Sequence, residues 1–265
     1  MNILVCIKQV PDTTEIKIDP VTNTLIRDGV PSIVNPFDAY ALEMAARIKD
    51  TDGSKVVVMS MGPDQAKKAL KECLTVGADK AYLVSDRAFG GSDTLATSYI
   101  LSKAVRAVEA QEGPFDVIFC GKQAIDGDTA QVGPELAEQL GYPQITFTTE
   151  VSVENGKVKA ERETENGKEV WESTVPVVIT SSKPAFDVRY PTVRARLAAN
   201  RTTIPALTLV DVSADAERSG LKGSPTKVKK TFVPVRNGGG IVIHEEHATE
   251  AAAKLATILN DIGLV

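Results

Sequence analysis

The chain has 265 residues, of which 43% are hydrophobic and 25% charged, so it is long enough for one large or two small domains with a buried core. Its formal net charge of −5 and pI of about 5.3 argue against binding of nucleic acid through bulk positive charge. The apolar start of the chain ends at Lys8, too early for a signal-peptide core or a membrane span, which predicts a soluble, cytoplasmic protein.

Short apolar runs alternate with helical patterns through the first half of the chain. The runs are β-branched and nearly continuous, as in parallel strands covered on both faces, and they lie at 3–8, 55–61, 80–85 and 116–120. Apolar residues keep helical spacing between and after them, at Phe37, Ala41, Met44, Ala45 and Ile48, at Leu101, Val105 and Val108, and at Leu136 and Leu140. This alternation predicts an α/β fold with a doubly wound parallel sheet, whose ligand crevice lies at the carboxyl ends of the strands.

Two segments depart from this rhythm. Residues 15–29 alternate, turn at "PVTN" and return, which predicts a hairpin after the first strand. Residues 145–180 carry Asn-Gly pairs at 155–156 and 166–167, each flanked by alternating residues, and this pattern predicts antiparallel strands.

Regular patterning weakens after residue 181. Residues 182–205 contain three prolines and four arginines, and 219–230 and 236–240 are typical of extended or loop structure. The chain ends in one amphipathic helix with Ala251, Leu255, Ile258 and Ile262 on one face and Gly263 at its stop. Such a helix either packs back on its own domain or docks on another protein.

The junction "GKQAIDGDTAQVG", residues 121–133, follows the strand at 116–120. Gly121 lets the backbone approach a ligand closely, and Asp128 is predicted to cap a helix that begins at Thr129. Backbone N–H groups at that helix start are suited to phosphate, although Pro134 must kink the helix or reset its start. The segment is therefore either a cradle for a ligand or a capped loop without one.

Three further junctions carry small, polar, turn-forming residues. "NPFDAYALE" opens a helix with Pro36 in its first turn, and Asn35 either caps it or reaches a ligand. "MGPDQA" opens the helix after residue 61, and Ser92 or Asp93 in "FGGSDT" is predicted to cap the helix that begins near residue 94. Neither GxGxxG nor GxxxxGK[ST] occurs, but the four junctions converge on one sheet edge, as a nucleotide site requires.

No residue pattern predicts acid–base or metal chemistry. The first histidine in the chain is His244, so the acids of the 121–133 junction lack the partner that general catalysis usually needs. His244 and His247 stand three residues apart, and a solvated helix start is favoured over a metal site there. Cys6, Cys73 and Cys120 have no metal-ligand spacing and are predicted to be free, buried thiols in a reducing compartment.

Four segments together resemble the small (beta) subunit of electron-transfer flavoproteins, and the resemblance covers essentially the whole chain. "VNPFDAYALE" is similar to the family's first nucleotide loop, and "GKQAIDGDTAQVGPELAEQLG" is similar to its main adenosine-phosphate loop. "VKAERETENGKEVWESTVPVVIT" is similar to the family signature, with Trp171 in place of an aliphatic residue. "RYPTVRARL" is similar to the partner-recognition loop, with Val193 where leucine is usual.

The resemblance implies a heterodimer with a larger alpha subunit, around which the C-terminal arm wraps. In the ordinary branch of the family the small subunit binds AMP as a structural nucleotide. In the electron-bifurcating branch it binds a second FAD, which NADH reduces and which splits electrons between ferredoxin or flavodoxin and the alpha-subunit FAD, the latter serving an acyl-CoA dehydrogenase-type partner. Residues 85–101 and 15–38 resemble the bifurcating branch, so we expect FAD, with AMP as the alternative.

The resemblance also implies an organisation of the chain: an α/β domain at 1–183, a partner-recognition loop at 184–200 and a C-terminal arm with its helix at 201–265. The residues implied at the partner are Arg189, Tyr190, Pro191, Thr192, Val193 and Arg194. The residues implied at the cofactor are Cys6, Asn35, Pro36, Phe37, Asp38, Met61, Gly62, Asp93, Thr94, Thr97, Gly121, Lys122, Gln123, Ala124, Ile125, Asp126, Gly127, Asp128, Thr129, Ala130, Gln131 and Val132. Gln123 and Gln131 suit hydrogen bonds to adenine, ribose or phosphate.

A rival interpretation is a hydrolase or ligase of the nucleotide-binding alpha-hydrolase type. Such an enzyme is expected to carry a phosphate loop such as SGGxDS after the first strand. The chain has "KQVPDTTE" there instead, which disfavours this interpretation. No catalytic residue is assigned, because the redox chemistry of a flavoprotein belongs to its cofactor.

Overall fold

The computed structural model describes residues 1–12, 31–154, 156–229 and 239–264, and it divides into two compact units, Met1–Lys229 and Lys230–Val265. Within the described residues, the larger unit contains a nine-stranded sheet with the order β11-β5-β4-β1-β6-β10-β7-β8-β9. Its strands are β1 (Asn2–Cys6), β4 (Lys55–Met61), β5 (Lys80–Val84), β6 (Val117–Gly121), β7 (Gln144–Glu154), β8 (Lys157–Thr164), β9 (Gly167–Thr174), β10 (Val177–Ser181) and β11 (Ala206–Leu207). The strands from β11 to β7 are parallel, which confirms the predicted sheet.

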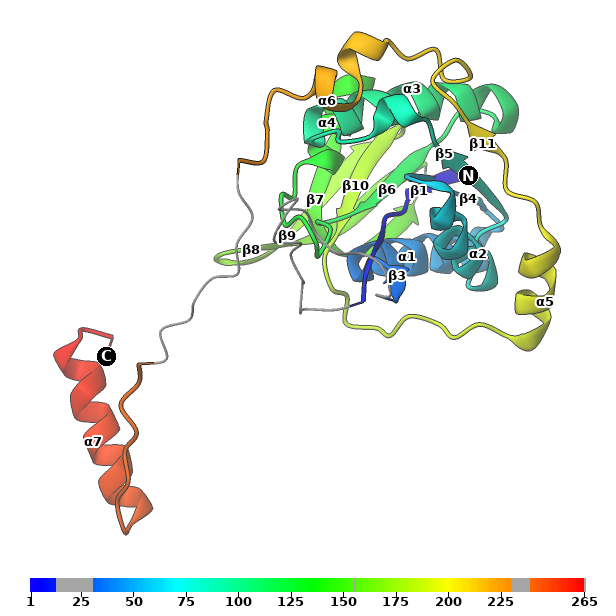
Figure 1. The fold of residues 1–265 in the computed structure, drawn as a ribbon. Helices are drawn as coiled ribbons and strands as arrows, with labels where there is room; N and C mark the ends of the chain where they lie inside the picture. The colour runs from blue at the N-terminus through cyan, green and yellow to red at the C-terminus, as the bar shows by residue number, and fades with distance from the viewer. Residues whose placement is uncertain (13–30, 155, 230–238, 265) are drawn as a thin grey trace. The chain divides into compact units, whose positions relative to one another are not determined.

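Helices cover both faces of this sheet (Figure 1). They are α1 (Pro36–Asp52) and α2 (Lys67–Thr75) on one face, and α3 (Thr94–Glu112) and α4 (Val132–Leu140) on the other. In β1, Ile3 and Val5 pack toward α1 and α2, whereas Leu4 and Cys6 pack toward α3 and α4. Because both faces of the strand are buried, its sequence is a continuous apolar run, and the doubly wound architecture follows.

The antiparallel extension consists of β7, β8 and β9, which pair as a meander. The prediction was wrong for the last strand of this segment, since β10 is not antiparallel: it pairs in parallel with both β6 and β7. All five residues of β10 are buried. A strand covered on both faces belongs in the interior of the parallel sheet, where its backbone groups find partners on both sides.

A small antiparallel pair, β2 (Gln9–Pro11) with β3 (Ser32–Val34), follows β1. The hairpin predicted at 15–29 lies outside the described residues. Asn35 follows β3 directly and leads into α1, which carries Pro36 at its first position as predicted. The pair therefore delivers the start of α1 to the carboxyl end of β1.

The segment after β10 has more regular structure than predicted. Helix α5 (Val193–Arg201) forms where the sequence pattern indicated a loop, because the Thr192 side chain accepts a hydrogen bond from the Ala195 N–H (3.1 Å) and caps it. Residues 219–230 were predicted to be extended or loop, but they contain α6 (Gly220–Gly223), preceded by the 3-10 turn η3 (Ala216–Arg218). The Ser224 hydroxyl donates to the Gly220 carbonyl (2.7 Å) and stabilises α6.

The smaller unit contains the predicted final helix, α7 (Ala248–Asp261). His247 immediately precedes the helix, and Gly263 has a φ of 72°, as expected for a helix stop. Within the described residues, no group of three or more histidine, cysteine or acidic side chains is arranged to hold a metal ion. No described helix combines the length and the apolar character needed to cross a membrane.

Glu112, the last residue of α3, lies at the sheet edge opposite the predicted crevice, where its carboxylate contacts residues of β4 and β5. It is almost fully buried and accepts hydrogen bonds from Lys55, Lys80 (2.8 Å) and the Tyr82 hydroxyl. Burial alone would raise the pKa of Glu112, but these hydrogen bonds outweigh it and lower the pKa to about 2. The contribution of Glu112 to stability is therefore present above its ordinary pKa near 4.5 and is lost as the pH falls through about 2.

We expect Glu112→Gln to lower the free energy of unfolding by about 2 kcal/mol at pH 7, because it weakens hydrogen bonds to buried charged groups. Urea denaturation at pH 7 and at pH 3 measures this difference, which should shrink at the lower pH. Glu163→Gln, which removes an exposed acid, is the control. Equal losses for both variants would contradict the assignment.

Candidate functional site

The carboxyl ends of β5, β4, β1 and β6 lie side by side because these strands are parallel neighbours. Cys6, Met61 and Gly121 end three of these strands. The four junctions therefore share one edge of the sheet, where ligands of doubly wound folds bind.

The loop at 121–131 is held by two buried side chains at the start of α1. The Gly121 N–H donates to Asp38 Oδ1 (3.0 Å). The Asn35 amide donates to the Gln123 carbonyl (2.8 Å), and its oxygen accepts from the Ile125 N–H (3.1 Å). Asn35 makes no side-chain capping bond to α1, so its amide serves the loop and not its own helix.

Lys8, which the sequence pattern did not single out, ties the end of β1 to the same cluster. Its N–H donates to Asp38 Oδ2 (2.7 Å), and its Nζ pairs with Asp126 Oδ1 (2.6 Å). Burial raises the pKa of Asp38 to about 7, although hydrogen bonds from the Lys8 N–H, Asn35 and the Gly121 N–H act in the opposite direction. The only sequence signal for Lys8 was its place at the end of the first apolar run.

The loop ends differently from the prediction. Helix α4 begins at Val132, and Asp128 is not its N-cap: its Oδ1 accepts from Gln123 Nε2 (2.7 Å) within the loop. Pro134 lies in the first turn of α4, where its missing N–H costs no helical hydrogen bond, so the proline resets the helix start. Asp128 and Ala130 have φ angles of 51° and 53°, left-handed values that few residues other than glycine adopt.

This geometry fits an anionic group. Among the described residues, the backbone N–H groups of Thr129, Ala130 and Gln131 have no hydrogen-bond acceptor, and they lie at the start of nine-residue α4. Such N–H groups, reinforced by the positive end of the helix dipole, bind phosphate. Lys122 adds positive charge beside the loop, with its Nζ 5.1 Å from the centre of the Phe147 ring.

The other predicted cofactor residues lie around this edge in varied roles. Cys6 and Cys120 are buried neighbours, and contact with Cys6 together with burial raises the pKa of Cys120, so that thiol is unreactive. Asp93 caps α3, as predicted, through Oδ1 and the Ala96 N–H (3.0 Å), while its Oδ2 accepts from the Thr226 N–H (3.0 Å).

Two of the remaining predicted cofactor residues, Thr94 and Thr97, lie in the first turns of α3. The others lie at the start of α1, next to the end of β4, and in the loop as far as the first residue of α4. The Thr94 hydroxyl donates to Glu135 Oε1 (3.1 Å), and Thr97 follows one turn later, half-buried. Burial raises the pKa of Glu135, whose Oε2 has no partner among the described residues. Glu135 was missed because its pattern is that of an ordinary helical acid.

The predicted partner residues fall into an anchored part and an exposed part. Arg189 is bound within the chain: its Nε donates to buried Glu43 (2.8 Å) and its Nη2 to Asp50 (2.8 Å). Tyr190 and Val193 are 92% and 76% exposed. Arg189 thus fixes the segment to α1, while its large apolar side chains face outward.

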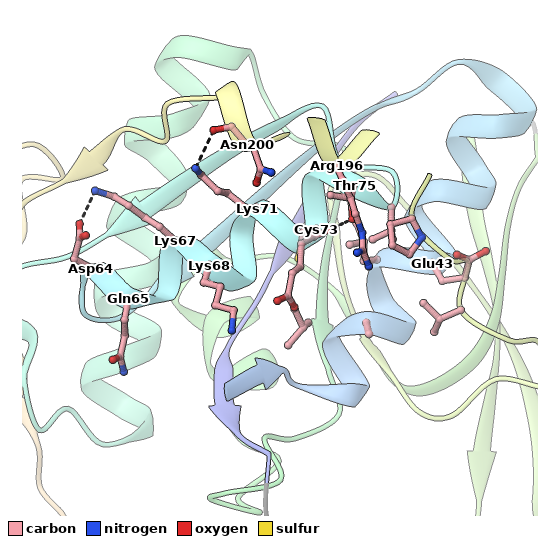
Figure 2. Close-up of a pocket in the computed structure, with 17 residues that line it drawn as sticks. Glu43, Asp64, Gln65, Lys67, Lys68, Lys71, Cys73, Thr75, Arg196 and Asn200 are labelled. Carbon is pink, nitrogen blue, oxygen red and sulfur yellow. Dashed lines mark hydrogen bonds and ion pairs between the residues drawn. The ribbon is translucent and has the colours of Figure 1, made fainter. Parts of the chain in front are cut away.

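A cavity with a volume of about 870 Å³ lies elsewhere in the larger unit, between α1, α2 and residues 188–200. Figure 2 shows Lys67, Lys68 and Lys71 of α2 along it, with Lys71 Nζ donating to the Asn200 carbonyl (3.2 Å). None of the described residues that line this cavity belongs to the 121–131 loop. Asp64 and Gln65, from the junction that follows β4, also line the cavity, so it borders the sheet edge but does not include the 121–131 loop.

Comparison with known proteins gives consistent matches along the chain. Residues 22–212 match the model of the electron transfer flavoprotein domain. The electron transfer flavoprotein subunit beta of Megasphaera elsdenii is 54% identical over 255 residues, covering 95% of this chain and 94% of its own. The subunit of that name from Clostridium acetobutylicum is 49% identical, and the caffeyl-CoA reductase-Etf complex subunit CarD of Acetobacterium woodii is 46% identical, each with 98% of both chains covered.

Proposed function

Because this chain belongs to the electron transfer flavoprotein family as a beta subunit, we propose that it binds FAD at the carboxyl edge of its sheet. We propose further that it works in a heterodimer with an alpha subunit and accepts electrons from NADH. The electrons then divide between ferredoxin or flavodoxin and, through the alpha-subunit FAD, an acyl-CoA dehydrogenase-type flavoenzyme.

The observation that carries the proposal is the loop at 121–131. It presents backbone N–H groups without described partners, two lysines nearby and a helix start, which together suit the diphosphate of a flavin nucleotide. FAD, when bound, supplies the redox chemistry. The chain's own residues hold the phosphates and fix the position of the loop.

One observation favours the electron-bifurcating role over a structural AMP site, and a second one bears on the partner enzyme. Residues 85–101 and 15–38 resemble the bifurcating branch of the family. The relative from Acetobacterium woodii is named as a subunit of a complex with a caffeyl-CoA reductase, which supports a CoA-ester enzyme as the partner of this chain.

We propose that the exposed residues of the partner-recognition loop, 184–200, bind that flavoenzyme. The α/β domain at 1–183 binds the nucleotide. The arm at 201–265 is proposed to wrap the alpha subunit. Within its own unit α7 has no other described helix or strand to cover its apolar face, which supports docking on a partner.

The nucleotide content of the purified alpha–beta complex tests the proposal. Nucleotides released by denaturation are identified and counted per heterodimer. Two FAD and no AMP are expected, which places the second FAD in this chain. One FAD and one AMP would contradict the bifurcating role and leave the chain as an AMP-binding subunit without its own redox centre.

Asp128→Ala is expected to weaken nucleotide retention about fivefold. The substitution removes the hydrogen bond from Gln123 and places a side chain without local polar contacts at a φ of 51°. Nucleotide that remains bound after dialysis measures the effect, with exposed Glu163→Gln as the control. Retention equal to that of the wild type would show that Asp128 has no part in shaping the loop.

A further inference from the structure

Asn35 and Asp38 stand at the start of a helix, where polar side chains ordinarily satisfy the helix's own N–H groups. Here the side-chain contacts go to other segments. Asp38 joins the backbone after β1 to the backbone at the end of β6, through Lys8 and Gly121. Asn35 holds the following turn at both Gln123 and Ile125.

Both side chains are almost fully buried, Asn35 at 1% and Asp38 at 6% exposure. Each carboxylate oxygen of Asp38 already accepts from a backbone N–H, and both ends of the Asn35 amide are engaged. Little of the surface of either side chain is thus open to a ligand. We therefore expect these two side chains to serve the nucleotide site by holding the 121–131 loop.

We propose that Asn35 and Asp38 are positioning residues, which hold the 121–131 loop in its phosphate-binding shape through the loop's backbone without contacting the nucleotide. The inference rests on the proposed nucleotide site. In this arrangement the two side chains shape the loop, and the backbone N–H groups of residues 129–131 contact the phosphate.

The proposal implies that nucleotide retention depends on pH. An ionised carboxylate makes stronger hydrogen bonds to N–H groups than a neutral carboxyl does. The pKa of Asp38, raised to about 7 by burial, places this change between pH 6 and pH 8. The loop should be held more tightly at pH 8 than at pH 6.

The other titratable groups facing Asp38 do not explain such a change. Burial raises the pKa of Cys73 on α2, and contact with Cys6 together with burial raises the pKa of Cys120 on β6, so both thiols stay neutral across this range. Lys8 faces Asp38 from the end of β1 and is paired with Asp126. Titration of the nucleotide itself is common to all variants and cancels in comparisons between them.

The test uses the alpha–beta heterodimer, with the nucleotide retained per heterodimer followed through repeated dilution at pH 6 and pH 8. Wild type is expected to lose its non-alpha-subunit nucleotide about tenfold faster at pH 6 than at pH 8. Asp38→Asn should lose it at the fast rate at both pH values. Glu138→Gln, which removes an exposed acid from α4, should behave as wild type.

Thermal unfolding adds a readout that separates positioning from general stability. The raised pKa means that ionisation of Asp38 costs stability, so the stability contribution of the neutral form is lost as the pH rises through about 7. The unfolding midpoint of wild type relative to Asp38→Asn should fall between pH 6 and pH 8 while retention rises. Midpoint and retention that change together would indicate a merely structural role and overturn the proposal.

Asn35→Ala keeps the proposal testable if Asp38→Asn does not assemble. It frees the turn at 123–125 but leaves the hydrogen bonds from the Lys8 and Gly121 N–H groups to Asp38, so release should be faster at both pH values and still depend on pH. Release at the wild-type rate from either variant would overturn the positioning role alone. A wild-type complex that holds neither AMP nor a second FAD would instead overturn the proposed function, and this inference with it.

Discussion

Val193→Asp is expected to weaken binding of the partner flavoenzyme about 30-fold while the flavin content of the complex stays unchanged. Val193 is 76% exposed at the first position of α5, between Tyr190 and Leu197, which are also exposed. A charge at the centre of an apolar docking surface costs about 2 kcal/mol, and every 1.4 kcal/mol is a tenfold change in affinity. The helix itself should tolerate the change, because aspartate is favourable at a helix N-terminus.

The measurement is the rate of electron transfer to the partner as a function of partner concentration, which separates binding from the transfer step. Val170→Asp is the matched control, since Val170 is 61% exposed on β9 and lies outside both the recognition segment and the C-terminal arm. A loss of flavin from Val193→Asp would show that this segment serves folding. Equal partner affinities for the two variants would show that Val193 is not part of the docking surface.

Gly121→Ala is expected to destabilise the α/β domain by about 3 kcal/mol and to release the nucleotide. An added Cβ would lie 2.2 Å from Asp38 Oδ1 and 2.8 Å from the Phe37 Cβ, so the start of α1 would have to move away from β6. That movement breaks the hydrogen bond from the Gly121 N–H to Asp38, and the buried carboxylate loses one of its two backbone donors.

Denaturant unfolding of the complex, with nucleotide content measured in parallel, tests this expectation. Gly127→Ala in the same loop provides the comparison for stability, because no atom lies within 4 Å of its added Cβ. Its free energy of unfolding should change by less than about 1 kcal/mol. Similar losses in the two variants would show that close approach at Gly121 does not hold the domain together.

The parallel sheet and its edge were predictable because a continuous apolar run indicates a strand that is buried on both faces. The same rule, applied to Val177–Ser181, identifies β10 as an interior parallel strand, but the neighbouring Asn-Gly turns drew the prediction toward an antiparallel strand. Strand partners depend on contacts between segments far apart in the chain, and a local sequence pattern does not predict those contacts.

The site was less predictable than the fold, because polar side chains have several uses that look alike in sequence. Asn35 stands where a helix cap is expected, yet its amide holds a turn 88 residues away in the sequence. Helix α5 was missed because only Ala199 among its residues is buried, so it lacks the apolar stripe by which helices are recognised. Asp128 was misassigned because Pro134, and not the nearest acid, decides where α4 begins.

The position of β10 between β6 and β7 also sets an order of events during synthesis. β6 ends at Gly121, but the strand that pairs with its free side is complete only at Ser181, about 60 residues later. At a synthesis rate of about 5–20 residues per second, the nascent chain exposes one edge of β6 for several seconds. The meander of β7, β8 and β9 gains its link to the parallel sheet only when β10 arrives, so ribosome-bound chains that end before residue 177 should be prone to aggregation through that edge.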